Sequence, residues 1–221
     1  MTREQEAQKL QAEGAYVTAI GILLSASPKH EQLLQLASED VFSAIPFAEE
    51  QTATQEGKHL LTAWAGACEE SQFDTLKLDY FKLFEGLGIP KAPPWESLYT
   101  NKEENLLFQE ETLHVRNWFK RYGLQIPNLY KEPDDNIAFE LQFVGHLTSK
   151  AADELEAGNA SEAEELLRAR QRFCSEHLLR WGFEWCILAI KEAQTSFYKG
   201  MAYLVEGILT ELGQQPRSEP Y

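Results

Sequence analysis

Four side chains near the middle of the chain are of the types that metal-dependent hydrolases use. Asp134, Asp135, Glu140 and His146 offer carboxylates and an imidazole, which are ordinary ligands of a catalytic metal ion. The periodicity of this segment indicates a helix, which rises about 1.5 Å per residue and separates Asp135 from His146 by roughly 16 Å. One ion cannot bind both residues. We therefore expect no metal site, and a small helical hydrolase is a disfavoured function.

The sequence contains no other pattern typical of catalysis. Neither a G-x-S-x-G, an H-E-x-x-H nor a phosphate-binding loop motif occurs. The three cysteines, Cys68, Cys174 and Cys186, lack metal-like spacing, and their odd number argues against a secreted disulfide framework. We therefore expect a cytoplasmic protein that requires no cofactor, with no motif that favours a hydrolase.

Residues suited to binding surround one loop. Glycine and proline recur between residues 86 and 94, which predicts a rigid, turn-rich segment. Aromatic side chains flank it on both sides, namely Tyr80, Phe81, Phe84, Trp95 and Tyr99. Such side chains most often belong to the core, but beside acidic residues they can also form an apolar groove with a carboxylate rim. That groove would suit an apolar peptide with a cationic end.

The charge balance favours a basic partner. The 221 residues include 20 Lys and Arg against 35 Asp and Glu, a formal net charge of −15, and the pI is about 4.8. A surface of this sign repels nucleic acid and acidic lipid, so we expect neither as a partner. The uncharged run 15–27 is too short to cross a bilayer and lacks a positive leading end. It predicts a buried first helix, with no stable membrane insertion.

The elements that position these side chains are expected to be helices. Apolar residues recur at helical spacing, and the predicted helices cover about 4–24, 30–38, 48–70, 73–86, 109–122, 133–158, 161 onward, 181–193 and 196–212. We predict an all-α fold with a single globular helical domain over residues 1–213 and a flexible tail at 214–221. The connector 123–131 contains Pro127 and could act as a hinge between two lobes.

Two helix starts carry specific signals. Pro133 suits a first-turn position, with Asp134 and Asp135 beside it at the positive end of the helix dipole. Ser161 and Glu164 have the spacing of a capping box. We therefore expect Asp135 to present its charge at the start of a central helix, where it can attract arginine. Two apolar stripes on that helix predict burial around much of its circumference.

Two segments resemble signatures of the TorD/DmsD family of chaperones. Residues 132–141, Glu-Pro-Asp-Asp-Asn-Ile-Ala-Phe-Glu-Leu, resemble the family's E-P-x-D-H signature with its following E-L; we call them the acidic motif. Residues 80–99, the aromatic motif, resemble the family's Y-x-x-L-F-x-G run and then, as Ala-Pro-Pro-Trp-Glu-Ser-Leu-Tyr, its P-A-P-P-W-x-S-V run. Their order and spacing agree with those of the family.

The resemblance implies a fold of about nine or ten helices and no enzymatic activity. It further implies that the chain binds, in the cytoplasm, the twin-arginine leader peptide of a molybdoenzyme precursor of the DMSO or TMAO reductase class. The binding positions that it suggests are Tyr80, Leu83, Phe84, Trp95, Tyr99, Glu132, Pro133, Asp135 and Asn136. Asp135 and Glu132 would meet the guanidinium groups, and the apolar residues would line a groove for the following apolar stretch. The family histidine is replaced by Asn136, which removes a titrating imidazole.

Alternatives stay open at this point. Within the family, the chain could assist assembly of a non-exported reductase subunit of the nitrate reductase type, although the Pro-Pro-Trp run argues against it. The expected partners are the leader peptide and the apo-form of a molybdenum-containing reductase. Because some family members exchange their C-terminal halves, we expect either a monomer or a domain-swapped homodimer joined through the connector 123–131.

Overall fold

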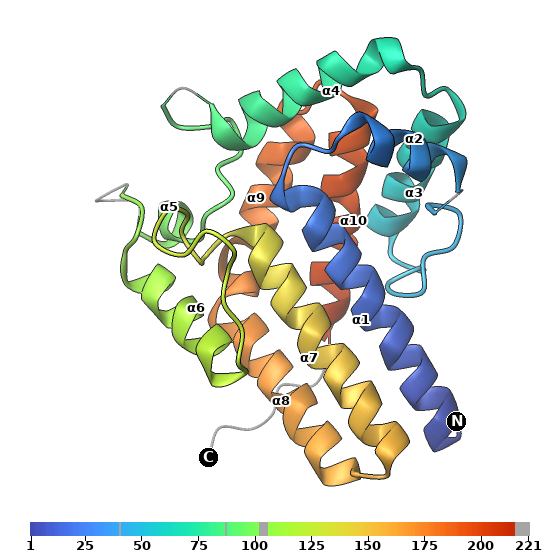
Figure 1. Cartoon of the computed structure of the whole chain (residues 1–221), viewed down its shortest axis with the longest axis vertical. Coiled ribbons are helices and arrows are strands. Elements are labelled where there is room, and N and C mark those ends of the chain that lie inside the picture. The colour runs from blue at the N-terminus through green and yellow to red at the C-terminus, as the bar shows by residue number, and fades with distance from the viewer. Residues whose placement is uncertain (40, 87, 102–105, 215–221) are drawn as a thin grey trace.

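The protein is described by a computed structural model that covers residues 1–39, 41–86, 88–101 and 106–214 (Figure 1). Within these ranges it contains ten α-helices and no β-strand, which confirms the predicted all-α fold. The helices are α1 Arg3–Ser25, α2 His30–Ser38, α3 Thr52–Gly66, α4 Phe73–Tyr80, α5 Ser97–Thr100, α6 Glu110–Arg121, α7 Ile137–Ala157, α8 Ala160–Glu176, α9 Leu178–Glu192 and α10 Ser196–Gln214. A 3-10 turn, Glu70–Gln72, precedes α4, and a π-helical turn, Phe81–Glu85, follows it. Residues 215–221 of the predicted tail lie outside the described ranges.

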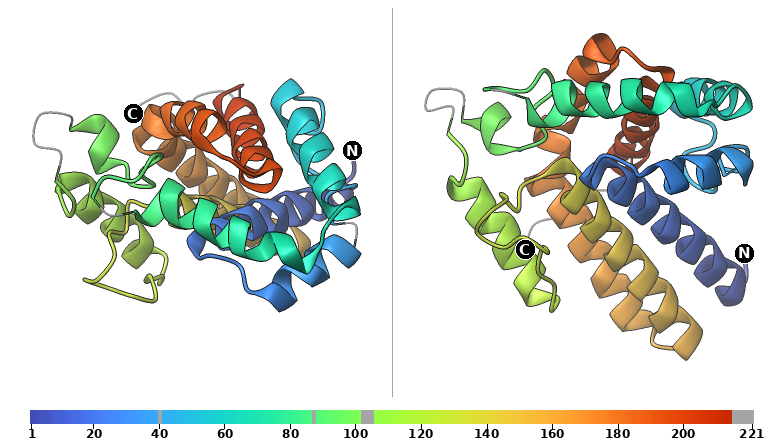
Figure 2. Two further views of the ribbon diagram at one scale, coloured as in Figure 1. Left: turned by 90° about the horizontal axis from the view of Figure 1, so that it is seen from above. Right: turned by 45° about the horizontal axis from the view of Figure 1, so that its top comes forward.

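The long helices α1 and α7 lie side by side at the centre of the molecule (Figures 1 and 2). Glycines make this close approach possible. A Cβ atom on Gly145 of α7 would lie 2.7 Å from the backbone oxygen of Gly14 on α1 and would also collide with Thr18. A Cβ on Gly21 would lie 2.6 Å from the backbone oxygen of Ala138. The spacing of these glycines therefore fixes how α1 packs on the helix that carries the end of the acidic motif.

A large hydrophobic core joins most of the helices, and a second, smaller cluster lies between the N-terminal part of α1, the C-terminal part of α7 and α8. The large core extends from Val17 to Leu212 and includes Phe119 and Phe143, which lie on either side of the connector 123–131. The side chains of both apolar stripes of α7 are buried, as predicted. Because the large core is continuous across the connector, the described residues form a single helical domain in this conformation.

Several helix boundaries differ from the sequence-based predictions; α4 ends at Tyr80 and not at 86, and α9 begins at Leu178, three residues before the predicted 181. Helix α7 begins at Ile137 with Asn136 as its N-cap, so Pro133 is not in the first turn; the backbone of 135–137 instead pairs with the aromatic motif. Helix α8 begins at Ala160, one residue before the predicted Ser161 cap. Helix α3 covers only Thr52–Gly66, because Ala48 has the left-handed φ of 59° and cannot extend the helix toward its N-terminus.

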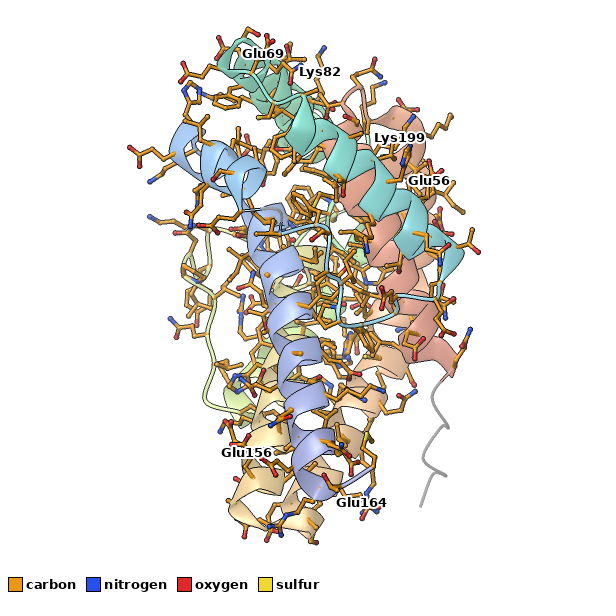
Figure 3. All side chains as sticks on the ribbon, turned by 90° about the vertical axis from the view of Figure 1, so that its right-hand side faces the viewer. Glu56, Glu69, Lys82, Glu156, Glu164 and Lys199 are labelled. Carbon is orange, nitrogen blue, oxygen red and sulfur yellow. The ribbon has the colours of Figure 1, made fainter. Side chains whose placement is uncertain are left out.

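Most of the charged side chains lie on the outside of this bundle, with a few buried inside it. Figure 3 shows Glu56, Glu69, Glu156 and Glu164 pointing away from the helices, whereas carbon-rich side chains fill the space between them. In the described part of the chain, no helix is both long enough and apolar enough to span a bilayer.

Candidate functional site

The two sequence motifs meet in space, although about 35 residues separate them along the chain. Trp95 and Asn136 form an isolated antiparallel bridge. The backbone N–H of Glu96 donates to the carbonyl of Asp135 at 2.8 Å, and the N–H of Ile137 donates to the carbonyl of Pro94 at 2.8 Å. We call this contact the motif junction. It joins the loop before α5 to the start of α7 and places the candidate residues in one region.

Asp135 holds the junction together from the inside. Its Oδ2 accepts a hydrogen bond from the backbone N–H of Ser97 at 2.9 Å, and its Oδ1 accepts one from the Thr112 hydroxyl at 2.6 Å. The residue has an exposed fraction of 0%. The expectation that Asp135 presents its charge at the surface is therefore wrong, because both carboxylate oxygens face α5 and α6.

Asp134 is also buried and paired within the protein. Its Oδ2 accepts hydrogen bonds from Arg116 Nη2 at 2.6 Å and Nε at 3.0 Å, which is a strong charge-assisted pair. The guanidinium of Arg116 in turn lies over the ring of Tyr130, 4.8 Å from its centroid. This chain of contacts fastens the connector to α6 and to the acidic motif.

The aromatic motif is mostly core. The ring of Phe84 stacks on Trp185 with centroids 5.9 Å apart, and the Tyr80 hydroxyl donates to the backbone oxygen of Leu24 at 3.3 Å. Tyr99 donates its hydroxyl hydrogen to the carbonyl of Pro93 at 2.8 Å. These side chains and that of Leu83 are buried. In this conformation Leu83, Phe84 and Tyr99 pack into the core, whereas Tyr80, with Phe81 and the exposed Glu85, lines part of a hollow of about 310 Å³ between α4 and the residues after α1.

Two of the nine predicted positions remain partly accessible. Trp95 and Glu132 are half-buried, whereas Pro133 and Asn136 are buried. Asn136 caps α7 by accepting a hydrogen bond from the N–H of Ala138 at 2.9 Å, and its Nδ2 donates to Glu132 Oε1 at 3.3 Å. Asn136 thus serves as a helix cap and orients the neighbouring carboxylate. Partial burial, and to a smaller extent the charge of Glu85, raises the pKa of Glu132.

Two further carboxylates of the motifs are buried: Glu96, for which the sequence suggested no role, and Glu140, a candidate ligand of the disfavoured metal site. Glu96 Oε2 pairs with His177 Nδ1 at 2.7 Å, and burial raises the pKa of Glu96 although this pair opposes the shift. Glu140 is completely buried, and neither of its oxygens has a hydrogen-bond partner of good geometry among the described residues. Burial raises its pKa well above the ordinary value, a shift that the nearby indole of Trp181 opposes. The sequence did contain a signal that Glu140 is buried, because its neighbours in α7, Phe139 and Leu141, are core residues.

The residues of the hydrolase alternative are dispersed. Asp134 binds Arg116, Asp135 binds Ser97 and Thr112, and His146 lines a different face of α7. Among the described residues, no three His, Cys, Asp or Glu side chains are grouped so that they could hold a metal ion.

Two of the other hollows in the described structure lie outside the motif junction. A polar cleft of about 580 Å³ between α6 and the α8–α9 corner is lined by Glu110, Glu111, His114, Glu176, His177 and Arg180. A groove of about 340 Å³ lies along α7 on the side of α1, α6 and residues 124–127, and we call it the α7 groove. Neither hollow could be predicted from the sequence, because the residues that line each of them come from segments that are distant in the chain.

Comparison with known proteins agrees with this architecture. The family described as "Nitrate reductase delta subunit" matches residues 48–186, a range that contains both motifs. The chain is 27% identical to "Chaperone protein TorD" of Aliivibrio fischeri over 186 residues, which is 83% of this chain and 84% of that protein. It is 30% identical to "Chaperone protein TorD" of Vibrio cholerae over 61% of this chain and 59% of that protein. It is 28% identical to "Tat proofreading chaperone DmsD" of Salmonella paratyphi A over 62% of this chain and 60% of that protein. The chain therefore belongs to the nitrate reductase delta subunit family, in its TorD/DmsD branch.

Proposed function

We propose that this protein is a cytoplasmic chaperone for the maturation of a molybdenum-containing reductase. It binds the twin-arginine leader peptide of the precursor and holds the apo-enzyme back from export until the cofactor is inserted. The observation that carries the proposal is the motif junction, which joins the two family signatures through backbone pairing. The chaperone names of its relatives support a binding role and argue against an enzyme.

The carboxylate suited to the arginine pair is Glu132. It is the partly accessible acid of the acidic motif, and the exposed Glu85 adds a second negative charge close to it. A guanidinium offers paired donors that match a carboxylate, so an arginine pair fits two neighbouring carboxylates. Half-buried Trp95 on the other side of the junction can cover the aliphatic part of an arginine side chain.

The remaining predicted positions act indirectly in this proposal. Tyr80, Leu83, Phe84, Tyr99 and Asp135 hold the shape of the junction, and their substitution changes peptide binding through the fold. Pro133 and Asn136 fix the start of α7 and thereby the direction of the Glu132 side chain.

A second candidate within the family is assembly of a reductase subunit that is not exported. The family description, nitrate reductase delta subunit, favours this alternative. In this alternative the protein recognises the reductase subunit itself, folded or folding, and no leader peptide is involved.

Binding to two forms of one reductase separates these candidates. The purified full chain is titrated with an apo-reductase precursor that carries its twin-arginine leader and with the same protein lacking the leader. The proposal predicts that removal of the leader weakens binding at least about tenfold, equivalent to about 1.4 kcal/mol. Equal affinity for both forms would favour the second candidate, and binding to neither would exclude both.

A further inference from the structure

The α7 groove has an apolar lining formed by three elements. Helix α6 contributes Phe119, helix α7 contributes Phe139 and Phe143, and the connector contributes Leu124, Ile126 and Pro127. Its volume of about 340 Å³ is in the range of natural ligand sites. The lining residues of α7 run from Phe139 to Ser149, ten residues along the helix, so the groove follows the helix for roughly 15 Å.

The polar side chains of the groove are uncharged hydrogen-bonding groups. They are Thr18, Gln125, Gln142, His146 and Ser149, and no Asp, Glu, Lys or Arg is among the lining residues. The Nε2 atom of His146 is buried and has no hydrogen-bond partner within the described structure. Burial, and to a smaller extent the positive charge of Lys150, lowers the pKa of His146 and so favours its neutral form, whereas the charge of Asp153 opposes this shift.

This composition suits one kind of ligand. An apolar peptide segment offers uncharged side chains for the phenylalanine and leucine surfaces, and its backbone amides need hydrogen-bond partners when they leave water. The glutamines, the serine and the free His146 Nε2 supply such partners. By contrast, the cleft at α6 is lined by Glu110, Glu176 and Arg180 and would require a charged ligand.

The position of the groove matches the order of groups in a twin-arginine leader, where two arginines precede an apolar stretch. Glu132 accepts a hydrogen bond from Asn136, the N-cap residue of α7. Phe139, the first residue of α7 that lines the groove, follows this cap by three positions. Going along α7 from its N-terminus, a peptide would therefore meet acidic groups first and an uncharged apolar surface next. A length of roughly 15 Å accommodates about five extended residues or ten helical ones.

We infer that the α7 groove binds the apolar stretch of the leader peptide. This inference rests on the proposed function and adds the surface on which that stretch docks. The apolar stretch thus lies against α7, residues 124–127 and α1, where Phe119, Phe143 and Ile126 form a buried floor and Leu124 and Pro127 are more exposed.

A charge placed in the groove tests this inference. Gln142→Glu keeps the size of a half-buried groove residue but adds a carboxylate, and Gln11→Glu makes the same change on the exposed face of α1. The probe is a synthetic peptide with two arginines and an apolar stretch, measured against the full chain by fluorescence anisotropy. Simple charge attraction would make both variants bind this cationic peptide more tightly. Docking in the groove instead predicts at least tenfold weaker binding for Gln142→Glu and little change for Gln11→Glu.

A second peptide distinguishes a failure of the groove inference from a failure of the proposed function. It keeps the arginines but replaces the apolar stretch by serine and glycine, and it should bind wild type and Gln142→Glu with the same low affinity. If the wild type binds the first peptide and Gln142→Glu binds it as tightly as Gln11→Glu does, the groove is overturned while the proposed function stands. If the wild type does not bind the first peptide, both are overturned. Thermal unfolding of each variant verifies that it is folded, and cross-linking of a photoreactive residue in the apolar stretch to residues 124–146 provides an independent readout.

Discussion

Substitution of Asp135 distinguishes a structural carboxylate from one that contacts the ligand. Asp135→Ala removes the acceptor of the Ser97 backbone N–H and of the Thr112 hydroxyl, both of which are buried. Leaving a buried donor without a partner costs about 1–3 kcal/mol, so two donors give an expected loss of roughly 2–6 kcal/mol in the free energy of unfolding. Asp135→Asn should cost about half as much, because the amide oxygen can still accept from Ser97 and the Thr112 hydroxyl can rotate to accept from the amide.

Chemical and thermal unfolding measure this loss. For a chain of this length, each kcal/mol lowers Tm by about 2–4 °C. Asp153→Ala is the matched control, since Asp153 is an exposed carboxylate on the same helix α7 and should change Tm by less than about 2 °C. The expected order of stability is wild type and Asp153→Ala together, then Asp135→Asn, then Asp135→Ala.

The same variants also test the role of Asp135 in binding. A structural role predicts that correctly folded Asp135→Asn binds the leader peptide with the salt dependence of the wild type. If Asp135→Asn were as stable as the wild type but had lost its salt dependence, the carboxylate would contact the arginine pair directly, and the placement of Asp135 inside the junction would be refuted.

Three further predictions concern stability and assembly. Because its folded pKa is raised, Glu140 costs stability as the pH rises above its unfolded value near 4.5. Glu140→Gln should therefore stabilise the protein at neutral pH. It should also reduce the decrease in the free energy of unfolding with rising pH by up to about 1.4 kcal/mol per pH unit. If urea unfolding gave the same pH profile for the variant and the wild type, this prediction would be contradicted. Gly145→Ala should lose about 1–3 kcal/mol by forcing α1 from α7, whereas Gly66→Ala, with open space around its Cβ, should not; equal melting temperatures would contradict the close approach. Refolding at high concentration should produce some dimer by exchange through the connector 123–131, and light scattering that finds only monomer would count against exchange.

The sequence was sufficient to predict nine of the ten helices in the described ranges and some of their ends; the short α5, Ser97–Thr100, lies in the aromatic-rich segment for which no helix was predicted. Helix α2 has the predicted bounds, and α7 ends at Gly158 as expected, because glycine favours the left-handed conformation at that position. The start of α7 was misplaced because Pro133 and the following acids satisfy the local rules for a helix start. A long-range contact, the pairing of Asp135 and Ile137 with the aromatic motif, takes precedence over those rules.

The candidate site was predicted in its location but not in its chemistry. Motif spacing identified both segments of the junction, yet neither periodicity nor resemblance indicates which way a side chain points. Asp135 therefore seemed available to a ligand, although Ser97 and Thr112 occupy its oxygens. The α7 groove could not be predicted, since its lining combines α1, α6, α7 and the connector.

The most direct test of the proposed function is the affinity of the full chain for two leader peptides that differ only at the arginine pair. Isothermal titration with the Arg-Arg peptide and with its Gln-Gln counterpart isolates the contribution of the guanidinium groups. We expect the Arg-Arg peptide to bind at least about tenfold more tightly, a difference that decreases with salt and is reduced in Glu132→Gln. Equal affinities for the two peptides, or an arginine preference that Glu132→Gln leaves intact, would contradict the account of leader recognition at the motif junction.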